Sequence, residues 1–545
     1  MRLLFLFCLF HAVHAVKIPF EVHTVSSFSG LTSSSTSSSY LERRDPVAIK
    51  NVANSIYVSD ITLGGRTIPV MLDTGSSDLW VTGQVSNSQD SGKSVTLEYA
   101  VGEAAGDILY ANLTFGNHSV SNQAFLLVTN TSSFSTNITS QGYSGLIGLG
   151  PNSGSSIRNK LNSDDTNRDA VLDRIFQQNQ TSRNYITFML GRANDPGSTV
   201  TGQLTISETV PGYENITNQP KLDVVTVPGL TDRDQHWQMY TDVDGIIGPD
   251  GQPIVYESIV PKAPKGQLVA IIDSGFTLPQ VPRSVSDAIY GRVQGAQWNT
   301  DNELWTIPCG QMLNISVKFG GINFPVHPLD TSSSDFGLRD SSGNPICVGT
   351  FQPITSAFSL LGEYDLILGM AFLRNIYTLI DLGKFVDGSA NDNGDAFIQL
   401  LSMTNTAAAH ADFVNVRLGG VDTAGQSQYY LLPASEGQSS PESAKEKKQH
   451  LEEKVLSRWP YIFLGSFVLF CGIVGLIVWR CCCRRRCAER KKAKALAKKR
   501  RMNGLQMNPL KGGDAYYQLD EPTSSIHSLP YSEGHPPSYH SGYRV

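Results

Sequence analysis

The feature that most constrains the fold of this chain is a short pattern that occurs twice. Residues 70–77 read Val-Met-Leu-Asp-Thr-Gly-Ser-Ser, and residues 270–277 read Ala-Ile-Ile-Asp-Ser-Gly-Phe-Thr. Each copy is an apolar strand that delivers an aspartate, Asp73 or Asp273, onto a turn made of a hydroxyl residue and a glycine. A single Asp-Thr-Gly is a common turn, so one copy alone would carry little weight.

Each copy also has an apolar companion further along the chain. Residues 145–149 read Gly-Leu-Ile-Gly-Leu in the first half, and residues 366–370 read Leu-Ile-Leu-Gly-Met in the second. Two copies with matched companions in the same order, within a β-rich chain, indicate an internal repeat and not two chance turns.

The region that holds the repeat is rich in short strand-like runs. Residues 56–63, 68–72 and 377–380 are examples, separated by Gly, Asn and Ser. Helical patterns are scarce, and residues 170–176 and 285–290 are the best of them. With 40% hydrophobic and 17% charged residues, the 545-residue chain can bury a large core, and we expect a mainly β domain from about residue 45 to 404.

The N-terminus is typical of a secreted protein. Residues 1–15 form an apolar stretch after a single arginine and end on small residues, which predicts a signal peptide cleaved after Ala15. Residues 16–44 are Ser-rich and close on Arg43-Arg44, which indicates a propeptide with a dibasic processing site. A solvated charge pair at the end of a flexible tail is the alternative for Arg43-Arg44.

A second apolar run predicts one membrane crossing. Residues 459–479 contain no charge and begin and end on Trp, as expected of a transmembrane helix. The net charge of −6 divides there into −15 before residue 480 and +9 after it, and residues 480–501 hold twelve Lys or Arg. The positive-inside rule therefore predicts a type I protein with a stalk at 405–458 and a disordered, basic cytosolic tail at 480–545.

Glycosylation motifs and cysteines agree with this topology. All the Asn-x-Ser/Thr sequons precede the apolar run, where glycosylation can reach them. They are Asn112, Asn117, Asn130, Asn137, Asn179, Asn215 and Asn314. In an oxidising compartment Cys309 and Cys347 are expected to form a disulfide, with two buried free thiols as the alternative.

Residues 46–404 resemble a pepsin-like aspartic protease, in which two β lobes each supply one aspartate across a cleft. Residues 73–81, Asp-Thr-Gly-Ser-Ser-Asp-Leu-Trp-Val, are similar to the family's first signature, and residues 99–106 resemble its flap hairpin with Tyr99 and Gly102. Residues 368–381 resemble a segment near the end of the second lobe. The resemblance implies lobes at about 45–220 and 221–404, and a disulfide between Cys309 and Cys347 fits the second lobe.

The resemblance also assigns roles. It implies that Asp73 and Asp273 hold a water and share one proton, since two close carboxylates cannot both ionise cheaply. It implies that Tyr99 closes over substrate and bonds toward Trp80. Residues expected to support the pair are Thr74, Gly75, Ser76, Ser274, Gly275 and Thr277, and residues expected in the cleft are Met71, Trp80 and Ile271.

One position departs from the family pattern. Phe276 stands where the second signature usually offers a hydroxyl, so Asp273 lacks a side-chain donor that would favour its charged form. We therefore expect Asp273 to be the protonated partner. The alternative is that Phe276 only packs in the cleft.

Other chemistries find no support in the sequence. The chain has no His-Glu-x-x-His, no Gly-x-Ser-x-Gly and no phosphate-binding Gly-Lys-Ser/Thr loop, and His11 and His14 lie in the signal peptide. We expect neither a cofactor nor a metal.

The tail carries short signals. Cys481, Cys482, Cys483 and Cys487 indicate palmitoylation at the membrane edge, with a metal cluster as the weaker interpretation. The basic run is expected to lie against anionic lipid and not to bind nucleic acid. Tyr516 to Leu519 fits a sorting signal, and Pro536, Pro537 and Tyr539 form a PPxY motif for a WW-domain ubiquitin ligase.

These features predict a monomeric, membrane-tethered aspartic endopeptidase that cleaves secreted or surface polypeptides at acidic pH. The rival hypothesis is a catalytically weak pepsin-like ectodomain that serves as a binding or adhesion receptor. The cell membrane is the expected site, with the endosome, Golgi and vacuole as alternatives. The signal, Ser-rich prosegment and dibasic site are similar to those of fungal surface aspartic proteases. The sequence leaves substrate specificity open.

Overall fold

The computed structural model describes residues 47–503 with internal gaps, and it divides into two compact units, one up to Trp459 and one from Pro460. The gaps are residues 49, 53–55, 100–101, 131–133, 135–137, 162–164, 179–182, 194–201, 228–234, 301, 341–342, 355–362, 387–393, 443–446 and 449–457. The signal peptide, the propeptide with Arg43-Arg44, the sorting signal and the PPxY motif lie outside the described residues.

The first half is built on one eight-stranded sheet, in the order β2-β3-β4-β9-β5-β8-β7-β6, and β3 also pairs with β7. Strand β3 alternates apolar residues with Asp60 and Thr62 near its end, which suits a strand with one face in the core. The strands are β2 (Lys50–Val52), β3 (Ile56–Leu63), β4 (Arg66–Asp73), β5 (Leu79–Thr82), β6 (Gln89–Tyr99), β7 (Gly102–Phe115), β8 (His118–Asn130) and β9 (Gly145–Gly148).

Two helices pack on this sheet, α1 (Ser156–Leu161) and α2 (Val171–Gln178). Helix α2 confirms the helical pattern at residues 170–176. Its apolar residues Val171, Leu172, Ile175 and Phe176 recur at helical spacing and are all buried.

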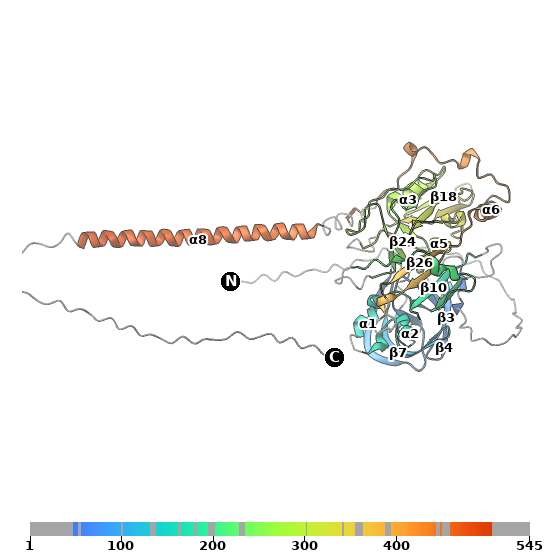
Figure 1. Cartoon of the computed structure of the whole chain (residues 1–545), viewed down its shortest axis with the longest axis horizontal. Coiled ribbons are helices and arrows are strands. Elements are labelled where there is room, and N and C mark those ends of the chain that lie inside the picture. The colour runs from blue at the N-terminus through green and yellow to red at the C-terminus, as the bar shows by residue number, and fades with distance from the viewer. Residues whose placement is uncertain are drawn as a thin grey trace, which may run out of the picture. The chain divides into compact units, whose positions relative to one another are not determined.

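A six-stranded sheet joins the two halves of the unit, in the order β1-β11-β10-β25-β26-β12. The central pair is antiparallel, with Tyr185 opposite Asp381 and Met189 opposite Tyr377. This sheet lies between β3, β4 and β7 on one side and α3 and β18 on the other (Figure 1). The strands are β1 (Val47–Ala48), β10 (Tyr185–Leu190), β11 (Gly202–Ile206), β12 (Leu222–Asp223), β25 (Ile376–Asp381) and β26 (Phe397–Ser402).

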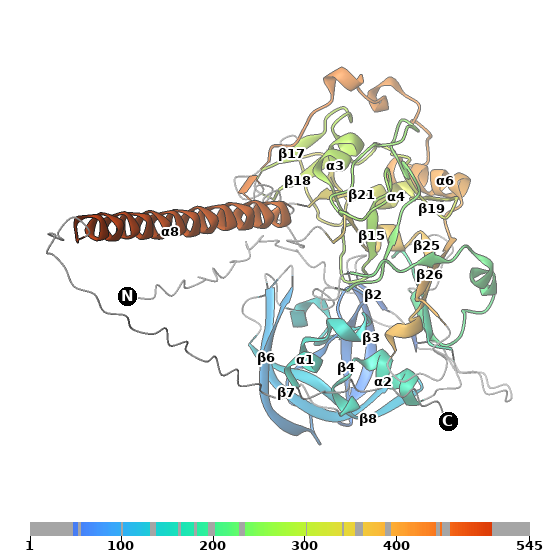
Figure 2. The ribbon, with the colours of Figure 1, turned by 60° about the vertical axis from the view of Figure 1, so that its left-hand side comes forward.

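The second half contains three small sheets, and the turned view separates it from the long strands β6, β7 and β8 (Figure 2). The first sheet has the order β13-β15-β24-β16-β23, the second β14-β19-β20 and the third β17-β18-β22-β21. The strands are β13 (Gln238–Tyr240), β14 (Ile246–Ile247), β15 (Val269–Ile272), β16 (Gln280–Val281), β17 (Gln297–Asn299), β18 (Leu304–Pro308), β19 (Ser316–Phe319), β20 (Ile322–Pro325), β21 (Ser332–Ser333), β22 (Ile346–Gly349), β23 (Gln352–Pro353) and β24 (Leu366–Leu368).

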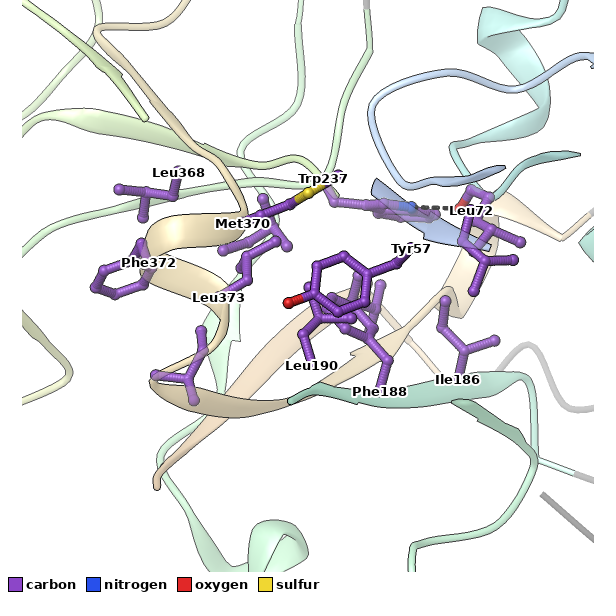
Figure 3. Packing of buried hydrophobic residues seen from close by; sticks show 14 of the residues in the cluster. Tyr57, Leu72, Ile186, Phe188, Leu190, Trp237, Leu368, Met370, Phe372 and Leu373 are labelled. Atoms are coloured by element: carbon purple, nitrogen blue, oxygen red, sulfur yellow. Dashed lines mark hydrogen bonds between the residues drawn. The ribbon is translucent and has the colours of Figure 1, made fainter. Parts of the chain in front are cut away.

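Three helices of the second half are short. They are α3 (Arg283–Tyr290), α4 (Pro328–Thr331) and α5 (Met370–Leu373), and α3 confirms the helical pattern at residues 285–290. The fold is therefore mainly β, as predicted. Its core runs through both halves: Tyr57 of β3, Phe188 of β10 and Phe372 of α5 belong to one buried cluster (Figure 3).

The repeated sequence pattern is also a structural repeat. Strand β4 pairs in parallel with β9, with Asp73 opposite Gly148. Strand β15 pairs in parallel with β24, with Ile272 opposite Leu368. In each half the apolar companion therefore lies beside the strand that ends at the aspartate.

The segment after residue 404 differs from the expected stalk. Helix α6 (Thr406–Arg417) is capped by Asn405, whose side chain accepts hydrogen bonds from the N–H groups of Ala407 and Ala408, and it buries Phe413 and Val414. Further along, Ser440 donates to Asp287 at 2.6 Å. Residues 405–442 thus contact the second half, through the buried Phe413 and Val414 and through hydrogen bonds such as that of Ser440. We call this segment the C-terminal strap.

The second unit is dominated by helix α8 (Trp459–Asn503), whose 45 residues extend well past the predicted end at Trp479. Ala, Lys and Arg continue the helix, and Gly504 follows its last residue in the sequence. Residues 480–503 are therefore helical, and the rest of the tail lies outside the described residues. Within the described chain this helix is long and apolar enough to cross a membrane, and its apolar side chains are exposed.

Candidate active site

The two aspartates of the repeat lie at the ends of equivalent strands. Asp73 is the last residue of β4, and Asp273 directly follows β15. Both side chains are buried. In each turn the glycine two residues on donates its N–H to the carboxylate: Gly75 to Asp73 at 2.9 Å, and Gly275 to Asp273 at 2.7 Å.

A symmetrical set of hydrogen bonds ties the two turns together. The Thr74 hydroxyl donates to the carbonyl of Ile272 at 2.8 Å and accepts from the N–H of Ser274 at 2.9 Å. The Ser274 hydroxyl donates to the carbonyl of Leu72 at 2.9 Å and accepts from the N–H of Thr74 at 3.0 Å. These buried bonds fix the two aspartates relative to each other, which is the geometry expected of Thr74 and Ser274.

The glycines let the carboxyl groups approach. A Cβ atom on Gly75 would lie 2.2 Å from Oδ2 of Asp273, and one on Gly275 would lie 2.5 Å from Oδ1 of Asp73. Each carboxyl thus touches the turn that carries the other, and any side chain at either position would push them apart.

The surroundings of the two carboxyls differ. Ser76 donates a hydroxyl hydrogen bond of 2.5 Å to Asp73, while Phe276 replaces the equivalent donor beside Asp273. Burial raises the pKa of Asp73, partly offset by Ser76 and Gly75. Burial and the charge of Asp73 raise the pKa of Asp273 well above its usual range, partly offset by the N–H of Gly275. The side-chain donor beside Asp73 has no counterpart beside Asp273, and the protonation of Asp273 stays a prediction.

Phe276 has apolar neighbours of its own. Its side chain packs against the buried cluster that contains Ile271 and Tyr364, and its carbonyl accepts from the N–H of Met370 at 2.7 Å. The backbone N–H of Phe276 also interacts with Asp273 and moderates the rise of its pKa. The half-buried Thr277 accepts from the N–H of Ala371 at 3.3 Å through its carbonyl.

The expected flap residues flank the turn of a hairpin. Tyr99 ends β6, Gly102 begins β7, and the two pair directly, while residues 100–101 between them lie outside the described chain. The Tyr99 ring lies 6.4 Å from that of Trp80. Burial, followed by the charges of Asp78 and Asp73, holds the pKa of the Tyr99 phenol well above its usual range.

The rings of Tyr99 and Trp80 lie close together, but the predicted hydrogen bond between the two side chains is not well formed. The Trp80 indole interacts with the Tyr99 phenol and partly offsets the rise of its pKa. The Trp80 Nε1–H nevertheless makes no hydrogen bond of good geometry within the described residues. Met71 and Ile271 each precede an aspartate by two residues and so share its face of the strand.

The remaining predicted residues are placed as follows. Cys309 and Cys347 form a disulfide in the second half. Of the sequon asparagines, Asn112, Asn117, Asn130, Asn215 and Asn314 are exposed. Asn137 and Asn179 lie outside the described residues. Cys481, Cys482, Cys483 and Cys487 are exposed on α8.

One residue near the pair was missed by the sequence analysis. His236 lies two residues before β13, and its Nδ1 lies 3.1 Å from the carbonyl oxygen of Gly75. No motif marks it, since it stands far from both repeats in the chain. Within the described residues, no cluster of three or more His, Cys, Asp or Glu side chains has the arrangement of a metal site.

Comparisons with known proteins show which family this chain resembles. A sequence model of the family described as eukaryotic aspartyl protease matches residues 83–391. Vacuolar protease A of Neurospora crassa is 24% identical over 69% of this chain and 90% of its own length. The major aspartyl peptidase 1 of Cryptococcus neoformans is 24% identical over 62% of this chain and 70% of its own length. An aspartic protease of Phaffia rhodozyma is 26% identical over 61% of this chain and 75% of its own length.

Proposed function

The chain belongs to the eukaryotic aspartyl protease family and is an aspartic endopeptidase, and from this premise we propose that it is tethered to a membrane and cleaves secreted or surface polypeptides at acidic pH. The observation that carries the proposal is the pair of buried carboxyls, Asp73 and Asp273, each of which touches the other's turn.

The proposed mechanism follows from the unequal surroundings of the pair. A water held between the carboxyls loses its proton to ionised Asp73 and attacks the scissile carbonyl carbon. Protonated Asp273 polarises the carbonyl oxygen, and no covalent intermediate forms. Two carboxyls that share one proton are the established arrangement in this family. Ser76 supports the charged form of Asp73, and Tyr99 excludes water over the substrate.

An acidic working pH follows from the shared proton. The pair is active only while one member is ionised and the other is protonated. The pKa of Asp273 is raised by burial and by Asp73, so it keeps its proton above the usual range of a carboxyl, but it loses that proton as the pH rises further. Activity is therefore lost on the alkaline side when both ionise and on the acid side when both are protonated.

The proposed tether is helix α8. Its first part is free of charge over residues 459–479, and the basic residues from Arg480 to Arg501 favour a cytosolic position for the end of the helix. This orientation puts the two-lobed domain in the secretory lumen or outside the cell. The five exposed sequon asparagines and the disulfide are consistent with that side of the membrane.

The decisive test uses the full-length chain in detergent micelles and a denatured protein as substrate. We expect cleavage at acidic pH that pepstatin blocks, and its loss in both Asp73→Asn and Asp273→Asn. If the native chain shows no pepstatin-sensitive cleavage and Asp73→Asn behaves identically, the proposed activity is wrong, and a binding or adhesion receptor becomes the better account.

A further inference from the structure

His236 is linked to the aspartate pair through a single residue. Its Nδ1 lies 3.1 Å from the carbonyl oxygen of Gly75, and the N–H of Gly75 donates to Asp73 at 2.9 Å. Because a carbonyl oxygen only accepts hydrogen bonds, Nδ1 must carry the hydrogen in both the neutral and the charged ring. The imidazole is therefore a fixed donor to the turn that orients Asp73.

The backbone around His236 is held in place from both sides. The amide of Gln235 accepts from the N–H of Val227 at 2.9 Å and donates to the carbonyls of Val225 and His236 at 3.0 and 2.8 Å. On the other side, the buried Trp237 donates from its indole to the carbonyl of Leu149 at 2.8 Å, as the dashed line in Figure 3 marks. These bonds fix the main chain that carries the half-buried imidazole, and the ring itself contacts Gly75 and Tyr364.

The titratable groups around His236 come from three elements. Asp73, at the end of β4, interacts electrostatically with the imidazole. Tyr364, before β24, packs its ring edge-on against it, with centroids 6.2 Å apart. Asp365, next to Tyr364 in the chain, is held instead by Ser258 at 2.6 Å and by the N–H groups of Ile259 and Val269 at 2.8 Å each. Asp273 contacts Gly75, while Asp73 is the carboxyl that Gly75, the partner of His236, binds through its N–H.

We propose that His236 is a positioning residue of the protease: at acidic pH its imidazolium, fixed on Gly75, keeps Asp73 as the ionised member of the pair and leaves the shared proton on Asp273. The inference rests on the proposed function and deepens it. It adds a second source of asymmetry, since Ser76 and His236 both favour the charged form of Asp73 while Phe276 offers Asp273 no hydroxyl.

The sign of the effect is fixed by electrostatics. A positive charge near Asp73 lowers its pKa, so the carboxyl stays ionised to a lower pH. Removing the charge from residue 236 raises the pKa of Asp73, and the acid limb of kcat/KM, which reports the free enzyme, moves to higher pH.

The test compares pH profiles of the full-length chain in detergent. His236→Gln keeps a donor for Gly75 but removes the charge, and we expect its acid limb to lie about half a pH unit higher. His236→Arg keeps a positive charge at every pH, and its acid limb stays at the native position. His410→Gln is the matched control, because His410 is an exposed histidine paired with Asp422 on the strap side of the unit.

Two outcomes overturn the inference: an unchanged acid limb in His236→Gln, or an equal shift in His236→Arg and His236→Gln. Thermal unfolding of each variant separates a loss of folding from a change in titration. A second measurement needs no activity: an NMR titration of the imidazole should move to lower pH in Asp73→Asn, since coupling between two sites is reciprocal. If the proposed function itself is wrong, the native chain shows no pepstatin-sensitive cleavage. This result is distinct from the outcomes above, which compare the variants with an active native chain.

Discussion

At the scale of single residues, the site depends on side-chain atoms that are absent as well as on the two carboxyls. Gly75 and Gly275 lack the Cβ that would separate the carboxyls. Phe276 lacks a hydroxyl that could donate to Asp273 as Ser76 donates to Asp73. Burial, followed by the charge of Asp73, raises the pKa of Asp273 well above its usual range, whereas Asp73 has Ser76 as a side-chain donor. The proposed protonation of Asp273 rests on this difference in donors.

We predict that Gly75→Ala lowers kcat/KM by about 100-fold, because a new Cβ displaces a carboxyl by about an ångström. The clash is direct: the added Cβ would lie 2.2 Å from Oδ2 of Asp273. Steady-state kinetics with a peptide substrate measures the effect. Gly425→Ala is the control, since a Cβ there meets open space. Activity of Gly75→Ala within about threefold of the native chain would contradict this account.

Phe276→Thr restores the missing hydroxyl. A hydroxyl donor favours the charged form of Asp273 and lowers its pKa, so we expect the alkaline limb of kcat/KM to fall by about half a pH unit. The pH profile measures this shift. Phe276→Leu, which is apolar and has no hydroxyl, should leave the limb unchanged. An identical alkaline limb in the native chain and in Phe276→Thr would refute the role given to Phe276.

At the scale of elements, the domain is held together by contacts between segments that lie far apart in the chain. Buried Asp330 of α4 accepts from Arg374, just after α5, at 2.8 Å and pairs with Arg192, which follows β10. These two arginines outweigh burial and hold the pKa of Asp330 well below its usual range. The strap adds α6, with Phe413 buried, to the same half.

Replacing Asp330 by Asn should destabilise the protein by about 3 kcal/mol, because two buried arginines lose their counter-charge. Thermal unfolding followed by tryptophan fluorescence measures the loss. The depressed pKa of Asp330 implies that its contribution is present above the unfolded-state pKa and is lost only as the pH falls through the lower folded-state value. The deficit should therefore persist at acidic working pH. Asp395→Asn, in an exposed pair with Lys384, is the control and should change little.

The strap makes a separate prediction. Phe413→Ala empties a buried site on α6 and should destabilise the domain by about 3 kcal/mol. Val416→Ala, on the same helix but 54% exposed, should change stability by less than about 0.5 kcal/mol. Chemical unfolding of the two variants distinguishes a packed strap from a stalk. Equal stabilities of the Phe413→Ala and Val416→Ala variants would mean that residues 405–442 are a free linker and not a packed strap.

At the scale of the whole molecule, the chain combines an acidic two-lobed domain with a basic helix end. The part of the chain before residue 480, which includes the domain, has a net charge of −15. The part from Arg480 on, after the apolar part of α8, has a net charge of +9. The proposed membrane tether accounts for this division of charge, since basic residues favour the cytosolic end of a span.

Ending the chain at residue 458 removes α8 and leaves the strap intact. Expressed in a secreting eukaryotic host, this shortened chain should release pepstatin-sensitive activity into the medium. The full-length chain should remain in the membrane pellet after alkaline carbonate extraction. Recovery of the full-length chain in the soluble fraction would contradict the proposed tether.

Much of the fold was predictable from local pattern. The two Asp-hydroxyl-Gly turns, their apolar companions, the mainly β character and the helices near 170–176 and 285–290 all reflect the order of residues over short windows. The helix over the apolar run at 459–479 was equally predictable, because the length and lack of charge that mark a candidate span are read without tertiary contacts. The end of α8 was not, since helix propensity continues past the span to Asn503.

The sequence by itself thus determined the two carboxyls, their turns and the missing hydroxyl at Phe276. Tertiary structure alone decided that β10 and β25 join the halves in one sheet, that residues 405–442 pack on the domain, and that His236 lies at Gly75. The physical reason is distance along the chain. Local patterns report which face of a strand or helix is apolar, whereas a histidine 161 residues from its partner has no local signal and acquires a role only when folding brings the two together.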